Sequence, residues 1–239
     1  MNRRPPKDLA VSIRGRLLAR SRQTGEDFQF LLQRYASERF LYRLGISPHR
    51  DRYVLKGAML FALWGGSLYR GTRDLDLTGY GSSETDAVIA AMQEICTLPV
   101  ATDGLSYDGA SVAAEPIRDT AEYNALRVRL NAALAGARIP MQIDIGFGNA
   151  VEPPATEADY PTLLDMPAPR IRAYPHEAVV AEKFHAMTCS ARSIAVTRIF
   201  TTSMFWQASS PLMESVSPAR LPRLSSAVAP RSTRRCPSP

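Results

Sequence analysis

The sequence has few cysteines and no long apolar run, and each absence excludes a class of protein. The three cysteines, Cys96, Cys189 and Cys236, lie far apart, without the spacing of a metal site or the even number of a disulfide framework. No stretch approaches the roughly 18 consecutive apolar residues of a membrane span. The basic N-terminus leads into an amphipathic stretch rather than an apolar signal core, so no secretory peptide is expected. We therefore expect a cytoplasmic protein with no membrane-embedded part.

Acidic residues are nearly absent from the last fifty residues of the chain. Residues 190–239 contain seven arginines, no lysine and a single acidic residue, Glu214. The whole chain carries a net charge of +6, yet residues 1–189 hold 22 basic and 22 acidic residues. The basic character belongs to the tail, so it is poor evidence that the folded body binds nucleic acid.

The spacing of apolar residues predicts two helices followed by a mixed sheet. Apolar residues recur every three or four positions over residues 9–22 and 25–44, with Thr24 and Asp27 as a capping-box-like start of the second helix and Gly45 as its end. Strands are expected at residues 53–55, 73–77, 105–113, 125–130 and 140–146. Further helices are expected at residues 58–64, 86–96 and 177–187. This order predicts an α+β fold with N-terminal helices and helices flanking a mixed sheet.

The same pattern divides the chain into four parts. Residues 1–50 form an N-terminal helical segment and residues 51–150 the core. Residues 151–188 are a proline-rich linker followed by the start of a C-terminal helical region, and residues 189–239 are a tail without periodicity.

Two acidic residues stand two positions apart in Arg73-Asp74-Leu75-Asp76-Leu77. On a strand they share one face, about 6.6 Å apart along the chain at ~3.3 Å per residue. Carboxylates so close repel each other unless a cation lies between them, and two Mg²⁺ ions ~3.5–4 Å apart are a known arrangement for in-line nucleotidyl transfer. Asp144, in another strand-like run, is a candidate third ligand. Without context, an isolated Asp-Leu-Asp is more often a solvated strand edge or turn.

The segment Lys56-Gly57-Ala58 follows a short apolar strand and precedes a helix. The backbone N–H groups and the positive dipole end at the start of such a helix can hold a triphosphate. The simpler interpretation is a structural turn, because a single glycine before a helix is common.

The order of these segments resembles that of the AbiEii/AbiGii toxin nucleotidyltransferases, over roughly residues 25–188. The resemblance is carried by four segments: Lys56-Gly57-Ala58, Thr72-Arg73-Asp74-Leu75-Asp76-Leu77, Gln142-Ile143-Asp144-Ile145-Gly146-Phe147-Gly148, and Tyr174-Pro175 with Val180-Ala181-Glu182-Lys183-Phe184. It implies a polymerase-β-like nucleotidyltransferase core with a helical C-terminal part, here truncated.

The resemblance also implies roles for particular residues. Asp74 and Asp76 would hold two Mg²⁺ ions, with Asp144 as the third carboxylate. The nucleotide would be bound by Lys56, Gly57, Ala58, Arg73 and Lys183. Ala58 stands where the wider superfamily has Gly or Ser, and the contact needs only backbone amides and a small side chain. Taken alone, Lys183 is equally consistent with an exposed helix lysine that pairs with local acids. Arg70 and Arg73 would either neutralise phosphate charge or support the carboxylates.

The function implied by the resemblance is transfer of a nucleoside monophosphate from an NTP to an acceptor. The acceptor would be an RNA such as tRNA, and the partner a cognate antitoxin. Two other interpretations stay open: an inactive truncated pseudoenzyme that at most binds nucleotide or a partner, and a nucleic-acid-binding protein that relies on its Arg-rich tail.

The sequence of the tail, residues 189–239, resembles the product of a shifted reading frame. Family members continue after this helix through Asn-Ser-Arg, Lys-Asp-Phe-x-Asp-Ile, Phe-x-x-Asp-Gly-Glu and an Arg-Arg-x-Thr-Pro-Leu segment. Back-translation of residues 189–215 and 223–234, read from the third base of each codon, allows closely similar segments in the same order. We therefore expect that a frame shift near residues 188–190 replaced the C-terminal helices, including an Asp-x-x-Asp motif.

Overall fold

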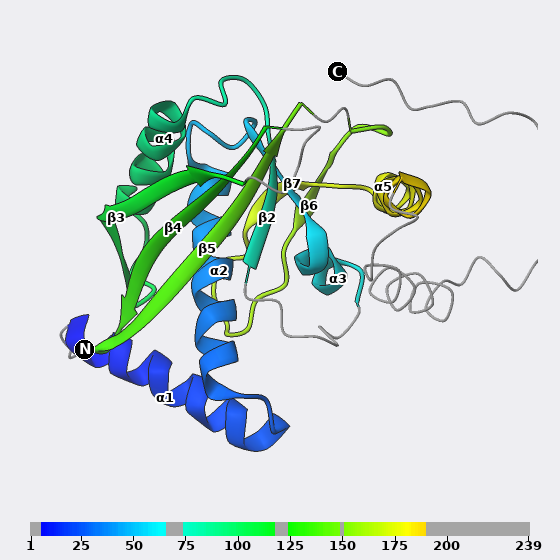
Figure 1. Cartoon of the computed structure of the whole chain (residues 1–239). Helices are drawn as coiled ribbons and strands as arrows, with labels where there is room; N and C mark the ends of the chain where they lie inside the picture. Colours follow the sequence, from blue (N-terminus) through cyan, green and yellow to red (C-terminus); the bar gives the residue numbers. More distant parts are fainter. Residues whose placement is uncertain (1–5, 66–73, 118–123, 149–150, 190–239) are drawn as a thin grey trace, which may run out of the picture. The chain divides into compact units, whose positions relative to one another are not determined.

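The computed structural model describes residues 6–65, 74–117, 124–148 and 151–189, all within one unit of the chain, residues 1–193 (Figure 1). Helix α1 (Pro6–Thr24) is followed by α2 (Phe28–Ile46), as the apolar periodicity predicted. The expected capping box is wrong in one respect. Asp27 is itself the N-cap of α2 and accepts a hydrogen bond from the Phe30 N–H at 2.9 Å, whereas the Thr24 hydroxyl donates back to Arg20 O within α1.

Gly45 does not end α2, contrary to the sequence prediction. The helix continues to Ile46, and the cap residue Ser47 donates its N–H to Leu44 O. A Cβ atom at Gly45 would overlap the carbonyl oxygen of Arg170 and lie 3.2 Å from its carbonyl carbon. The glycine therefore serves close packing of α2 against the strand that contains Arg170, rather than helix termination.

Seven strands form one mixed sheet in the order β3-β4-β5-β2-β1-β7-β6. Their bounds are β1 Tyr53–Lys56, β2 Asp74–Gly79, β3 Leu105–Pro116, β4 Ala125–Leu134, β5 Ala137–Phe147, β6 Thr156–Asp159 and β7 Arg170–Ala173. The pairs β2–β5 and β1–β7 are parallel, and the others are antiparallel. The predicted α+β class with a mixed sheet and flanking helices is confirmed.

The segment expected to be a linker contributes two of these strands. Strand β7 pairs with β1 through Leu55 and Ala173, and β6 pairs with β7 at the edge of the sheet. Each is only four residues long, and β6 is mostly exposed, so neither leaves a strong alternating pattern in a proline-rich sequence. The sheet thus extends beyond the core boundary predicted at residue 150.

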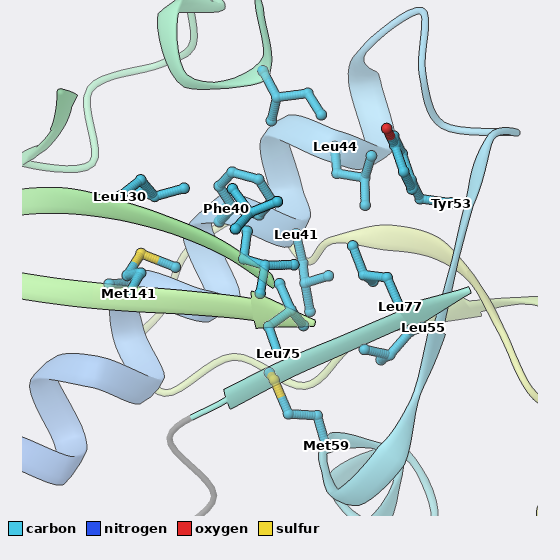
Figure 2. Close-up of a cluster of buried hydrophobic side chains, with 14 of the residues drawn as sticks. Phe40, Leu41, Leu44, Tyr53, Leu55, Met59, Leu75, Leu77, Leu130 and Met141 are labelled. Carbon is cyan, nitrogen blue, oxygen red and sulfur yellow. The ribbon is translucent and has the colours of Figure 1, made fainter. Parts of the chain in front are cut away.

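The apolar core lies on one face of the sheet. Helices α2 and α4 (Thr85–Thr97) pack there, and Figure 2 shows Phe40, Leu41 and Leu44 of α2 meeting the inward side chains of the strands. These are fully or almost fully buried, among them Leu55, Leu75, Leu77, Leu130 and Met141. On β2, β4 and β5 these residues alternate with polar ones, so the opposite face of the sheet carries the polar side chains.

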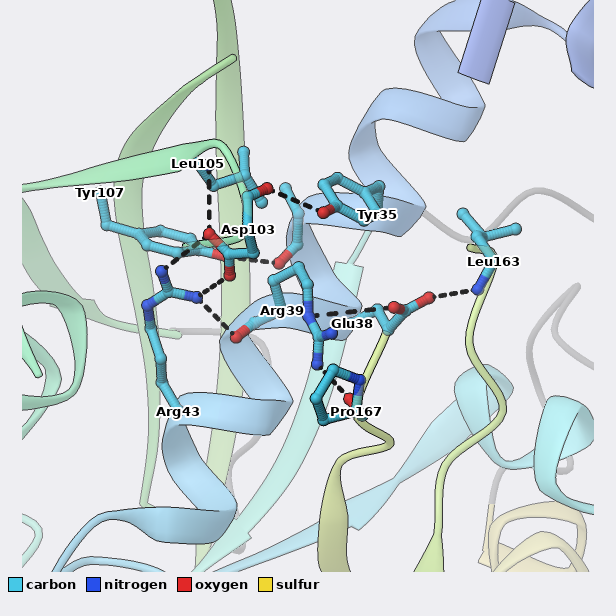
Figure 3. Close-up of polar contacts among 10 residues, drawn as sticks. Tyr35, Glu38, Arg39, Arg43, Asp103, Leu105, Tyr107, Leu163 and Pro167 are labelled. Carbon is cyan, nitrogen blue, oxygen red and sulfur yellow. Dashed lines mark hydrogen bonds and ion pairs between the residues drawn. The ribbon is translucent and has the colours of Figure 1, made fainter. Parts of the chain in front are cut away.

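Buried polar groups join α2 to two loops (Figure 3). Arg43 donates two hydrogen bonds to the Asp103 carboxylate, at 2.6 and 3.2 Å. Glu38 accepts from the Leu163 N–H at 2.7 Å, and Arg39 donates to Pro167 O at 2.7 Å. These contacts link residues at least sixty positions apart in the chain and fix the loops on α2.

The remaining helical elements flank β1. A turn of 3-10 helix (Gly57–Met59) leads into the short helix α3 (Leu60–Leu63), and α5 (His176–Cys189) follows β7. The rings of Trp64 and His176 stack with centroids 3.8 Å apart, which joins the end of α3 to the start of α5. No helix in the described ranges is long and apolar enough to span a membrane. The cytoplasmic location stays a prediction.

Candidate active site

A row of charged residues crosses five neighbouring strands on the polar face of the sheet. The registers pair Lys56 of β1 with Asp76 of β2, Asp76 with Asp144 of β5, Asp144 with Arg127 of β4, and Arg127 with Glu115 of β3. Directly opposed residues of adjacent strands point to the same side and lie within reach of one another. The row therefore brings together Lys56, Asp76 and Asp144, which the sequence analysis named from separate segments.

The carboxyl group of Asp76, in the middle of this row, has a raised pKa. Burial raises the pKa of Asp76 to about 6; the positive charge of Lys56 opposes the shift, while the negative charges of Asp144 and Asp74 add to it. Lys183 of α5 also acts on Asp76, in the same direction as Lys56. Lys183 is thus within electrostatic range of Asp76, and its contact with nucleotide phosphates stays a prediction.

Gly57 packs its backbone directly against Asp76. The residue has a φ of +73°, which favours glycine. A Cβ atom there would overlap Oδ2 of Asp76 and lie 2.7 Å from its Cγ. Any larger residue would displace the carboxylate, so the glycine of Lys56-Gly57-Ala58 is required by the geometry of the acid.

The helix after Gly57 is shorter than expected. Residues 58–64 were predicted to be one helix, but Ala58 lies in a single 3-10 turn and α3 has only four residues. The helix dipole at this end is correspondingly small, because few peptide units align. The Lys56 side chain is a stronger positive group here, and its Nζ lies 3.2 Å from the position of a Cβ atom on Gly146.

Asp74 opens strand β2 and is exposed, opposite Gln142 on β5. It lies on the same face as Asp76, as the i, i+2 spacing predicted. Arg73, expected to bind nucleotide, lies outside the described residues, as do Arg70 and Thr72.

Arg127 is the residue of this site that the sequence analysis missed. Its Nε donates to Asp144 Oδ1 at 2.9 Å and its Nη2 to Oδ2 at 2.8 Å, and these bonds raise the pKa of Arg127. The available signal was the alternation on β4, where Arg127 and Arg129 stand between Leu126, Val128 and Leu130. That pattern places Arg127 on the polar face but does not reveal its partner.

Tyr174 anchors the chain between the sheet and α5. Its N–H donates to Leu55 O at 3.0 Å, and its hydroxyl lies 2.7 Å from the Thr78 hydroxyl. Thr78 is two residues beyond Asp76 on the same face of β2. These contacts of Tyr174 therefore fix where α5 begins, and with it the position of Lys183 on that helix.

Asp74, Asp76 and Asp144 lie on the same face of the sheet, but they do not form a closed cage for a divalent cation. In the ranges that the structure describes, no group of three His, Cys, Asp or Glu side chains is arranged to hold a metal ion. Both oxygens of Asp144 instead accept hydrogen bonds from Arg127. Burial chiefly, and then the negative charges of Asp144 and Asp74, raise the pKa of Asp76, and a bound cation would relieve the repulsion among these acids.

Two solved structures from Helicobacter pylori are similar to this chain. The crystal structure of JHP933 is 16% identical, with a TM-score of 0.39, over 62% of this chain and 53% of that one. A putative nucleotidyltransferase is 15% identical, with a TM-score of 0.38, over 66% of this chain and 59% of that one. This chain therefore spans little more than half the length of either. No curated protein matches the chain significantly.

Residues 39–198 match the family described as nucleotidyl transferase AbiEii toxin of the Type IV toxin–antitoxin system. The matched range contains every described candidate residue, from Lys56 and Gly57 through Asp144 to Lys183. It also contains Arg127 and most of the sheet. The chain belongs to the AbiEii nucleotidyl transferase toxin family.

Proposed function

We propose that this chain is a Mg²⁺-dependent nucleotidyltransferase, which transfers a nucleoside monophosphate from an NTP to an acceptor. The observation that carries the proposal is the cross-strand row, in which Asp76 lies between Lys56 and Asp144, with Asp74 two residues away on the same face. Adjacent acids flanked by lysines suit a substrate that brings both phosphate charge and divalent cations.

Each residue of the site has a part in this proposal. Asp74 and Asp76 would hold two Mg²⁺ ions with Asp144 as the third ligand, and the bound ions would supply Lewis-acid stabilisation of the phosphoryl oxygens. Lys56 and Lys183 would offset phosphate charge, since both already act on Asp76. Gly57 lets the backbone lie close to Asp76, because a glycine has no side chain to overlap the carboxylate.

The acceptor and the partner follow from family membership alone. We propose an RNA acceptor such as tRNA, and a cognate antitoxin as the protein partner, with the reaction taking place in the cytoplasm. Support comes from the toxin–antitoxin description of the family.

The direct test is Mg²⁺-dependent incorporation of α-labelled NTP into RNA, by the full chain and by a frame-restored version. Asp74→Asn and Asp76→Asn are each expected to lower incorporation at least about 100-fold, because each removes a charged metal ligand. Asp159→Asn is the matched control, an exposed acid on the distant strand β6. Labelling that survives both site substitutions would show that these acids do not carry the reaction.

The engagement of Asp144 by Arg127, together with the frame shift expected in the tail, favours a second candidate function. A pseudoenzyme that binds nucleotide without turnover would keep such an arrangement. An NTP would then raise the melting temperature of the full chain while no label is incorporated. Turnover by the full chain would rule this candidate out.

A further inference from the structure

Asp144 is bound by a cation that belongs to the protein itself. The Arg127 guanidinium donates to both carboxylate oxygens, at 2.9 and 2.8 Å, and the Gln142 amide approaches one of them at 3.5 Å. Two parallel bonds of this kind are among the strongest side-chain contacts and fix the plane of the carboxylate. Asp144 is thereby turned toward β4, although its other neighbour in the row is Asp76 on β2.

We propose that Arg127 is a positioning residue that competes with divalent cations for Asp144. In the cation-free protein Arg127 holds both oxygens of Asp144, and it must loosen or share at least one of them before Asp144 can join Asp74 and Asp76 as a ligand. The inference rests on the proposed function, because it requires a cation site at these acids.

The surroundings of the pair allow such an exchange. The side chains of Arg127 and Asp144 are 32% and 20% exposed, so neither is sealed in the core. Glu115 lies directly opposite Arg127 on β3, which gives a released guanidinium a second carboxylate within reach. Exchange therefore needs a side-chain movement and no rearrangement of the sheet.

Arg129 provides a matched comparison on the same strand. It points to the same face as Arg127 but is opposite Gln142 rather than Asp144, and its guanidinium pairs with Glu115. If Arg127 weakened cation binding only through the general positive charge of this face, removal of either arginine would have a similar effect. Direct competition predicts a difference between them.

The experiment is calorimetric titration of Mn²⁺ into the full chain after treatment with EDTA. Arg127→Gln is expected to bind Mn²⁺ about tenfold more tightly than the wild type, since an opposite charge in contact shifts a carboxylate equilibrium by one to three powers of ten. Arg129→Gln is expected to bind with nearly wild-type affinity. Asp144→Asn is expected to bind more weakly, because a ligand is lost.

A second variant separates the two bonds from the charge. Arg127→Lys keeps the positive charge but cannot form two parallel bonds. Its affinity for Mn²⁺ is expected to lie between those of the wild type and Arg127→Gln. An Arg127→Lys affinity equal to the wild-type value would assign the effect to charge alone and overturn the proposal.

The pair itself can be checked without metal. In EDTA, Arg127→Gln and Asp144→Asn are each expected to lower the melting temperature, and the double variant by less than the sum of the two. Additive losses would mean that the two side chains are not coupled, contrary to the proposal.

The outcomes distinguish this inference from the proposed function. Equal or weaker Mn²⁺ binding by Arg127→Gln, with binding still abolished by Asp76→Asn, would overturn competition by Arg127 and leave the cation site intact. Absence of Mn²⁺ binding by the wild type and by every variant would overturn the cation site, and the inference with it.

Discussion

At the scale of single residues, Glu38 is a buried acid without a full set of partners. Its Oε2 accepts from the Leu163 N–H, whereas its Oε1 has no hydrogen bond from any residue that the structure describes and lies 3.9 Å from Arg39 Nε. Burial raises the pKa of Glu38 to about 7; the Leu163 bond and the charges of Arg39, Arg34 and Arg20 oppose the shift. Between pH 4.5 and about 7 the folded protein therefore keeps a proton on Glu38 that the unfolded chain has lost.

This predicts a specific loss of stability with rising pH. Between pH 4.5 and about 7 the folded state binds more protons at Glu38 than the unfolded state, so the free energy of unfolding falls as pH rises through that window. At 1.36 kcal/mol per pKa unit the loss is roughly 3 kcal/mol. Glu38→Gln, which keeps an acceptor for Leu163 and does not ionise, is expected to escape most of it.

Urea unfolding at pH 5 and pH 8 measures the effect. Wild-type protein and the exposed control Glu152→Gln should lose stability in parallel, and Glu38→Gln should lose roughly 2–3 kcal/mol less. Other groups that titrate in this range are common to all three proteins and cancel in the comparison. Parallel curves for all three proteins would contradict the assignment.

At the scale of elements, the contact of α2 with β7 depends on the absence of one side chain. Gly45→Ala would place a methyl group on the Arg170 carbonyl, which is backbone and cannot rotate away. We expect a loss of about 1–3 kcal/mol in the free energy of unfolding. The higher helix propensity of alanine, worth up to ~1 kcal/mol, would offset only part of it.

Gly15→Ala in α1 is the matched control for this prediction. Gly15 is also a helical glycine, but a Cβ atom there would meet nothing within 4 Å. This variant should gain up to ~1 kcal/mol from helix propensity alone. If chemical denaturation gave the same sign for both variants, close packing at Gly45 would not be the reason for its glycine.

At the scale of the whole molecule, the frame shift expected in residues 189–239 stays a prediction, because the structure describes only the first of these residues, Cys189, at the end of α5. The family match ends at residue 198, so most of this tail lies beyond it. Resequencing the gene across the codons for residues 186–192 tests the frame shift. The shifted frame is expected to run on through Asp-Phe-x-Asp-Ile, whereas an immediate stop codon would show that the tail is genuine.

The sequence by itself determined the local features. The 3.6-residue period located α1, α2 and α4, a short apolar run located β1, and strand-like patterns located β2 to β5 within a few residues, because these patterns depend on neighbours along the chain. The same alternation placed Asp74 and Asp76 on one face. Four-residue strands such as β6 carry too little pattern to be recognised, and the glycine at position 45 looks like a helix end until its contact with Arg170 is known.

Only the tertiary structure decided which faces meet. Alternation puts Asp76, Asp144 and Arg127 on polar faces of three strands, but the order and register of those strands are set by core packing across dozens of residues. A shift of one residue in β4 would have turned Arg127 to the core and left Asp144 free. Local spacing in the sequence therefore decided that Asp74 and Asp76 share one face. Long-range pairing decided which residues of other strands lie beside them, because strand register is a property of the assembled sheet.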